Sequence, residues 1–208
     1  MKKNSLRLKF LAIFSLLCCY SYAAGVVDIT NKLTNPSFEI DDITALTPKT
    51  ESADGLRGYI QPQPVGWTYG GSAIDKQLII TTDCFTDNNF GKVTTLTDGT
   101  QGYYLRMGWS AGSSTLNQTI TLSAGKYRFA ADIRSAYNGT ATSSIKIVAG
   151  SDNSNTPFTK GSVPCFPTMA WSTVSVDFTV TEEKQIPLGF AITWVSGGSC
   201  VMIDNVKL

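Results

Sequence analysis

Histidine is absent from all 208 residues of the chain. Hydrolases that depend on an imidazole base are therefore excluded, and so are metal centres built on imidazole ligands. Charged residues are also scarce, at 16% of the sequence, and beyond residue 23 no cluster of lysine and arginine marks a surface for nucleic acid. These absences exclude imidazole-based catalysis and nucleic-acid recognition.

The first 23 residues read as a signal peptide. The apolar run at residues 10–19 has about half the roughly 20 residues that a membrane-spanning helix needs. Ser21 and Ala23 place small residues where a cleavage after Ala23 requires them. We therefore expect an exported protein that is secreted, periplasmic or held at the cell surface. The basic residues that precede the apolar run are Lys2, Lys3, Arg7 and Lys9.

The five cysteines bear on both the export signal and the rest of the chain. Cleavage before Cys18 or Cys19, with lipid attachment, is the alternative to a simple signal and would tether the protein to a membrane. Cleavage after residue 23 leaves Cys84, Cys165 and Cys200. In an oxidising compartment these predict one disulfide and one buried thiol, with all three pairings open. They lack the Cys-x-x-Cys spacing of zinc sites.

Residues 24–208 form a segment long enough for a single domain with a substantial core. The whole chain has net charge +1, and loss of the four basic residues of the signal leaves −3. Two segments, 41–64 and 151–167, carry prolines and little periodicity. They predict two long surface excursions, each either a decorated loop or one wall of a binding site.

Short segments in the second half of the sequence alternate apolar and polar residues. In residues 126–135, for example, Phe129 and Ile133 share one face while Arg134 lies on the other. Segments of this kind follow one another at intervals of roughly ten residues with Gly, Ser, Asn and Asp between them, which predicts an all-β, antiparallel sandwich. The segments are 103–107, 115–122, 126–135, 145–148, 171–180, 186–195 and 200–208.

Several short motifs occur in a characteristic order along the chain. They are Leu-Thr-Asn-Pro-Ser-Phe-Glu at 33–39, Pro-Val-Gly-Trp at 64–67, Gly-Tyr-Tyr-Leu-Arg at 102–106, Gln-Thr-Ile at 118–120, Ala-Gly-Lys-Tyr at 124–127, Trp171 ahead of Phe-Thr-Val at 178–180, and Ile-Asp-Asn-Val-Lys-Leu at 203–208. In this order they resemble carbohydrate-binding modules of the galactose-binding-like jelly-roll type, which accompany xylanases and other polysaccharide-degrading enzymes. The resemblance covers most of residues 26–208 and implies a jelly roll that binds a polysaccharide or glycan.

The resemblance also implies a structural calcium ion. In such modules the acids of the opening and closing motifs meet at one ion, which here means Glu39 and Asp204. Calcium takes about six to eight oxygen ligands, and a cation relieves the repulsion between two carboxylates that are brought together. Oxygens at Ser37 and in the loop that contains Asp98 are further candidate ligands. Capping a turn, or pairing with a surface lysine, is the alternative role for each acid.

The aromatic residues divide into core residues and candidate ligand-binding residues. The resemblance places Trp67 and Trp171 in the core, and alternation favours the core for Trp194, with stacking on a sugar as the alternative for each. Exposed aromatic rings stack on the flat faces of sugars, while neighbouring polar groups bind the hydroxyls. We therefore expect ligand contacts from a set of aromatic residues and from polar residues on the face of 126–135 opposite the core: Trp109, Tyr137, Tyr69, Arg134 and Asp132.

Three functions are consistent with these features. Non-catalytic binding of a polysaccharide or glycan is favoured by the ordered motifs. An adhesion or assembly domain, alone or in an enzyme or surface complex, would use the same sandwich to bind protein. A jelly-roll polysaccharide lyase would need a tyrosine as acid or base beside an arginine, for which Tyr103, Tyr104, Arg106 and Arg134 are candidates. Binding is preferred to catalysis because no motif identifies paired carboxylates.

Overall fold

The computed structural model describes residues 25–51, 56–72, 76–82, 95–107, 110–135, 143–150, 158–159, 161–165, 170–195 and 200–208. The predicted signal peptide therefore lies outside the described residues. One sheet contains β1 (Thr47–Glu51), β2 (Leu56–Ile60), β4 (Lys76–Ile80), β5 (Gly102–Arg106), β13 (Cys200–Lys207), β7 (Gly125–Ser135), β11 (Ser172–Val180) and β9 (Phe158–Thr159). The other contains β10 (Gly161–Cys165), β8 (Ser143–Ala149), β12 (Lys184–Trp194), β6 (Gly112–Leu122) and β3 (Thr68–Gly71).

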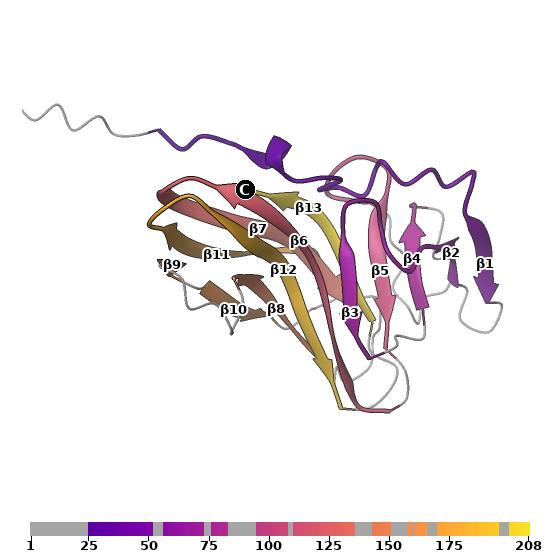
Figure 1. The fold of residues 1–208 in the computed structure, drawn as a ribbon. Coiled ribbons are helices and arrows are strands. Elements are labelled where there is room, and N and C mark those ends of the chain that lie inside the picture. The colour runs from indigo at the N-terminus through magenta and orange to yellow at the C-terminus, as the bar shows by residue number, and fades with distance from the viewer. Residues whose placement is uncertain are drawn as a thin grey trace, which may run out of the picture.

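These strands form an eight-stranded sheet, in the order β1-β2-β4-β5-β13-β7-β11-β9, and a five-stranded sheet, in the order β10-β8-β12-β6-β3 (Figure 1). Neighbouring strands are antiparallel throughout. The all-β antiparallel sandwich predicted from the sequence is confirmed, and each of the seven alternating segments contains a strand. Among the described residues, no helix has the length and apolar character needed to cross a bilayer.

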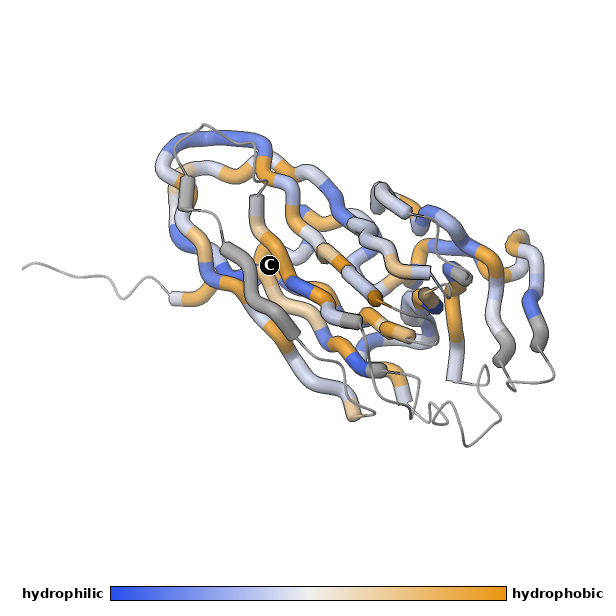
Figure 2. The backbone as a smooth tube through the Cα atoms, turned by 90° about the horizontal axis from the view of Figure 1, so that it is seen from below, coloured by the Kyte–Doolittle hydropathy of each residue, from blue (hydrophilic) through white to orange (hydrophobic). Residues whose placement is uncertain are grey.

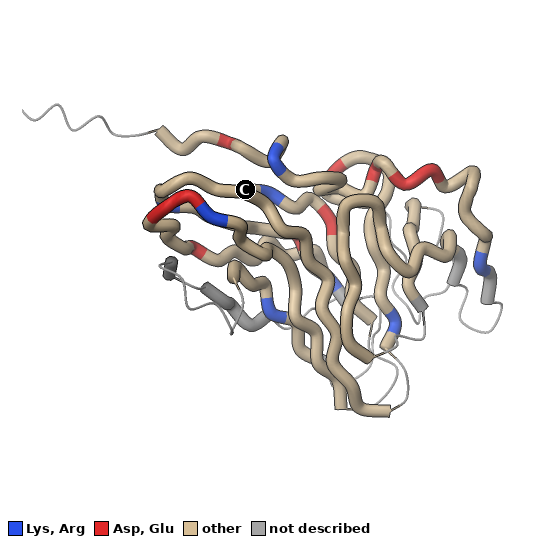
Figure 3. Tube along the Cα trace, in the orientation of Figure 1, with Lys and Arg blue, Asp and Glu red and all other residues tan. Residues whose placement is uncertain are grey.

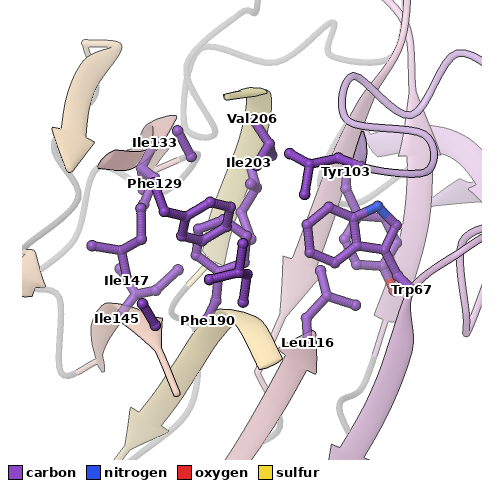
Figure 4. Packing of buried hydrophobic residues seen from close by; sticks show 14 of the residues in the cluster. Trp67, Tyr103, Leu116, Phe129, Ile133, Ile145, Ile147, Phe190, Ile203 and Val206 are labelled. Carbon is purple, nitrogen blue, oxygen red and sulfur yellow. The ribbon is translucent and has the colours of Figure 1, made fainter. Parts of the chain in front are cut away.

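The main core lies between the two sheets and is built from alternate residues of the long strands. In β6, for example, Leu116 and Leu122 are fully buried while the intervening Thr119 and Thr121 are exposed. Seen from below in Figure 2, several strands show this pattern as apolar segments between polar ones. Figure 4 shows Trp67, Tyr103 and Leu116 at one end of the core. Trp67 and Trp194 are 1% and 4% exposed, which confirms their predicted place in the core.

A second, smaller apolar cluster lies on the outer face of the eight-stranded sheet at β4, β5 and β13. β5 and β13 are buried on both faces, so Tyr104 and Met202 point away from the main core and pack with Cys200. Trp171 packs against this cluster, whereas the resemblance implied a place in the core. The Cys200 Sγ accepts a hydrogen bond from Tyr104 Oη at 2.9 Å. Cys84 lies outside the described residues, so the predicted disulfide stays a prediction.

Both predicted excursions contain strands. Residues 41–64 include β1 and β2, and residues 151–167 include β9 and β10. Alternation is missing from β1 because it is an edge strand with Thr47 and Pro48 exposed, so its position depends on pairing with β2 rather than on a buried face. In Figure 1, β4, β2 and β1 continue the wider sheet beyond β3.

The N-terminal segment lies along the end of the last strand. The backbone amide of Ile29 donates to the carbonyl of Leu208 at 2.9 Å, and that of Val206 donates to Pro36 at 3.1 Å. Thr30 Oγ1 also accepts a hydrogen bond from the Leu208 amide at 3.0 Å. The first and last described segments therefore meet, as the predicted contact between the opening and closing motifs requires.

Candidate functional site

A turn at the opening motif orients the first predicted metal ligand. Phe38 has φ 62°, in the left-handed region that a bulky residue rarely occupies. Its ring is fully buried and stacks on Trp67 and Tyr103, with centroid separations of 5.7 and 5.3 Å. This packing holds the unfavourable backbone conformation in place. The following residue, Glu39, is thereby directed to the loop formed by residues 95–101.

Glu39 binds this loop near its C-terminal end. Its Oε1 accepts hydrogen bonds from the backbone amides of Thr100 and Gln101 at 2.7 and 2.5 Å, and its Oε2 accepts one from Thr100 Oγ1 at 2.8 Å. Gly99 faces the same carboxylate with φ 62°, and a Cβ atom there would lie 2.4 Å from Glu39 Oε1. The close approach and the backbone conformation both require glycine at this position.

Asp204 binds the other end of the same loop from β13. Its Oδ2 accepts hydrogen bonds from the backbone amides of Thr97 and Asp98 at 2.7 and 3.0 Å. The side chain is fully buried, and burial raises the pKa of Asp204 to about 6 although these hydrogen bonds act to lower it. Within the described ranges, no positively charged group contributes to the pKa of Asp204. The carboxylate is therefore a buried anion held by amide groups.

All four residues predicted to bind calcium lie at this loop. Ser37 joins them through a hydrogen bond from its Oγ to Asp98 Oδ2 at 2.5 Å. The side chains offer only oxygen atoms, which calcium prefers, and the buried Asp204 lacks a compensating cation, so these residues fit the ion. In the described part of the chain, no three acidic or cysteine side chains group closely enough to hold a metal. Backbone carbonyls would therefore supply most of the ligands.

Asp132 and Arg134 lie on the outer face of β7, as predicted, but this face is covered. The two side chains are 7% and 6% exposed. Asp132 accepts hydrogen bonds from Thr173 Oγ1 at 2.5 Å and from Asn205 Nδ2 at 2.8 Å, and the Arg134 Cζ lies 5.7 Å from the ring centroid of Trp171. The expected open patch is not found here, because Trp171 and the second apolar cluster lie on this face.

The three predicted aromatic contacts fall in different parts of the structure. Tyr69 lies on β3, half-buried against the main core, and its hydroxyl donates to the carbonyl of Ser72. Burial raises the pKa of Tyr69, and the nearby Ser114 hydroxyl opposes the rise. Trp109 and Tyr137 lie outside the described residues, so their contacts with a ligand stay predictions.

The outer face of the five-stranded sheet is lined by small, hydrogen-bonding residues. Strand pairing arranges them in rows, one of which runs from Gly70 through Thr115 and Ala191 to Lys146. Lys146 is the one charged residue that the described strands place on this face, and Figure 3 shows β3 and β6 without charge. The face also includes Thr68, Ser113, Asn117, Thr119, Thr121, Ser144, Gly189 and Thr193.

Sequence reasoning emphasised aromatic residues and missed this polar face. The signal was present in residues 113–121, where every second residue is serine, threonine or asparagine. That alternation predicted the strand correctly. It did not distinguish a binding face from an ordinary solvated one, because both are polar.

Neither a family model nor a curated protein matches the sequence. Among solved structures, the carbohydrate-binding module TmCBM61, in complex with β-1,4-galactotriose, aligns with TM-score 0.53 and 16% identity over 85% of this chain and 95% of the module. The tailspike protein 4 enzymatically active domain of bacteriophage CBA120 aligns with TM-score 0.54 and 12% identity over 86% of this chain and 21% of that one. Other matches are carbohydrate-binding modules of several families. The chain therefore has the fold of the β-sandwich carbohydrate-binding modules.

Proposed function

We propose that this protein binds a neutral, β-linked polysaccharide through the outer face of the five-stranded sheet. The observation that carries the proposal is the composition of that face, where hydroxyl side chains and Asn117 predominate on β3 and β6 and Lys146 is the one charged residue of the described strands. Such groups exchange hydrogen bonds with sugar hydroxyls, whereas a polymer of uronic acids would favour arginine and lysine. The shared fold with a module solved with β-1,4-galactotriose supports a β-linked polymer of neutral hexoses.

Binding without catalysis is part of the proposal. Tyr103 and Tyr104, the tyrosines considered for a lyase, are both fully buried. Burial also raises the pKa of Tyr103, which makes its phenol a weaker acid. Neither hydroxyl lies where a polymer could reach it. We further propose that the protein acts outside the cytoplasm, which the predicted signal peptide supports.

Removing hydrogen-bonding groups from the outer face should weaken polysaccharide binding. We expect Thr115→Val and Asn117→Ala each to lower the affinity about tenfold, since a lost hydrogen bond to a ligand has an effect of this order. Affinity electrophoresis in gels that contain β-1,4-galactan, xylan or mixed-linkage β-glucan measures the change. Thr179→Val, on the outer face of the other sheet, is the matched control and should bind as the wild type does.

Two results would contradict the proposal. If the wild type is not retarded by any of the three polymers, the chain is not a binder of such polysaccharides. If the wild type is retarded and Thr115→Val and Asn117→Ala are retarded equally, the polymer binds elsewhere on the molecule.

We also propose that a calcium ion binds beside the loop 95–101. The support comes from its two flanking carboxylates, Glu39 and Asp204, and from the buried charge of Asp204. The ion would join the opening motif to β13 and so fix the loop between them. Its effect on stability is considered in the Discussion.

A further inference from the structure

The loop 95–101 is exposed, but buried polar side chains border it. Residues 97–100 lie at the surface, and so does Glu39. In contrast, Asp204 is fully buried, and Ser37 and Gln101 are each 9% exposed. Burial of a polar side chain is unfavourable unless its polar atoms find partners. The partners of these three side chains therefore indicate what the loop is arranged to hold.

Two of the three buried side chains have hydrogen-bond partners in the loop. Asp204 accepts from the amides of Thr97 and Asp98, and Ser37 donates to the Asp98 carboxylate. The third side chain differs, because the buried Gln101 Oε1 has no hydrogen-bond partner among the described residues. An acceptor left in this way is destabilising, so it points to a donor or a cation that binds in another state of the site.

The position of Gln101 links it to both of the acids at this loop. Its backbone amide donates to Glu39 Oε1 at 2.5 Å, so these two residues are in direct contact. The next residue, Gly102, lies against the other acid, since a Cβ atom on it would be 3.9 Å from the Asp204 Cβ. Gln101 therefore lies between the two carboxylates that we propose to bind calcium.

An amide oxygen is a suitable calcium ligand at this position. Calcium takes about six to eight oxygens, and the amide oxygens of asparagine and glutamine serve beside carboxylates and backbone carbonyls. Glu39 and Asp204 already supply negative charge, and Asp204 is fully buried. A neutral oxygen adds a ligand without adding a further anion, which burial would make unfavourable.

We infer that Gln101 Oε1 is a ligand of the calcium ion, an inference that rests on the ion proposed at this loop. Binding would supply the partner that this buried oxygen lacks in the metal-free chain. The ion would then hold the loop through Gln101 as well as through Glu39 and Asp204. Sequence analysis did not identify this residue, because glutamine is uncharged and position 101 precedes the motif at 102–106.

Replacing Gln101 by leucine tests this role, because leucine has a similar size and lacks the oxygen. We expect Gln101→Leu to weaken calcium binding about tenfold, measured by isothermal titration calorimetry on protein treated with a chelator. The thermal midpoint of the metal-free variant should stay the same or rise, since an unpartnered acceptor is no longer buried.

Two further variants distinguish a ligand from a structural amide. Gln77→Leu is the matched control, because Gln77 lies on β4 and its Nε2 donates to the Pro62 carbonyl at 3.0 Å. Loss of this bond should lower the metal-free midpoint slightly and leave the calcium affinity unchanged. Gln101→Glu should lower the metal-free midpoint and bind calcium more tightly, because a buried carboxylate requires a compensating cation.

The outcomes separate the ligand from the ion. If Gln101→Leu binds calcium as tightly as the wild type, the inference is overturned, the calcium ion stands, and water satisfies the buried oxygen. If the wild type binds no calcium, the ion and its ligand are both overturned. Retardation of the same wild-type protein by the three polymers then still tests polysaccharide binding separately.

Discussion

Calcium should raise the thermal midpoint of the metal-free protein. At a free concentration about a thousandfold above its dissociation constant, one ion that binds the folded state alone adds about 4 kcal/mol to the free energy of unfolding. The ion would compensate the buried charge of Asp204 and fix the loop 95–101, which Glu39 and Asp204 hold from either end. Calorimetry after treatment with a chelator, with and without added calcium, measures the shift.

Three acid-to-amide variants show whether the effect belongs to this site. Glu39→Gln and Asp204→Asn should lose the response to calcium. Asp42→Asn should keep it, because the Asp42 carboxylate is exposed and its hydrogen bonds are local, chiefly to Thr44. An unchanged midpoint in the wild type after calcium is added would show that amide hydrogen bonds alone hold the loop.

Trp67→Ala should cause the largest loss of stability from a single side chain, about 3–5 kcal/mol. The ring is 1% exposed and lies between Phe38 and Phe190, with centroid separations of 5.7 and 6.1 Å. Its Nε1 also donates to the Asn35 carbonyl at 3.0 Å, so the opening motif loses a contact as well. Urea unfolding followed by circular dichroism gives the change in the free energy of unfolding.

Trp171→Ala provides the comparison for this prediction. Trp171 is half-buried on the second apolar cluster, outside the main core, so its loss should cost clearly less. Equal losses for the two variants would mean that the outer cluster contributes as much as the core between the sheets.

The sequence predicts strands well where one face is buried and the other is solvated. Residues 115–122 and 126–135 alternate for this reason, and both form long strands. Residues 47–51 have no such pattern because β1 is an edge strand, held by its pairing with the adjacent strand β2 rather than by a buried face. Residues 76–80 do not alternate either, because β4 is buried on both faces, with Ile79 in the main core and Leu78 and Ile80 in the second apolar cluster.

The site was predictable to the extent that it belongs to continuous motifs. Glu39 and Asp204 each lie in one, and the structure brings both to the same loop. The polar outer face of the five-stranded sheet was not recognised, because its residues come from β3, β6, β8 and β12, which only the fold brings together. The burial of Asp132 and Arg134 on the outer face of the eight-stranded sheet was not predictable either, because their strand alternates apolar and polar residues as a half-exposed strand does.

The contacts at the loop 95–101 also bear on the order in which the molecule can assemble. Glu39 is among the first residues of the described chain to be synthesised, and Asp204 is among the last. Asp98 and its neighbours therefore stay without their second anchor until β13 has been synthesised, and the N-terminal segment at Ile29 has no Leu208 to pair with before then. Pairings between such distant segments form slowly. The nascent domain should consequently remain open, and accessible to chaperones, until β13 has left the ribosome.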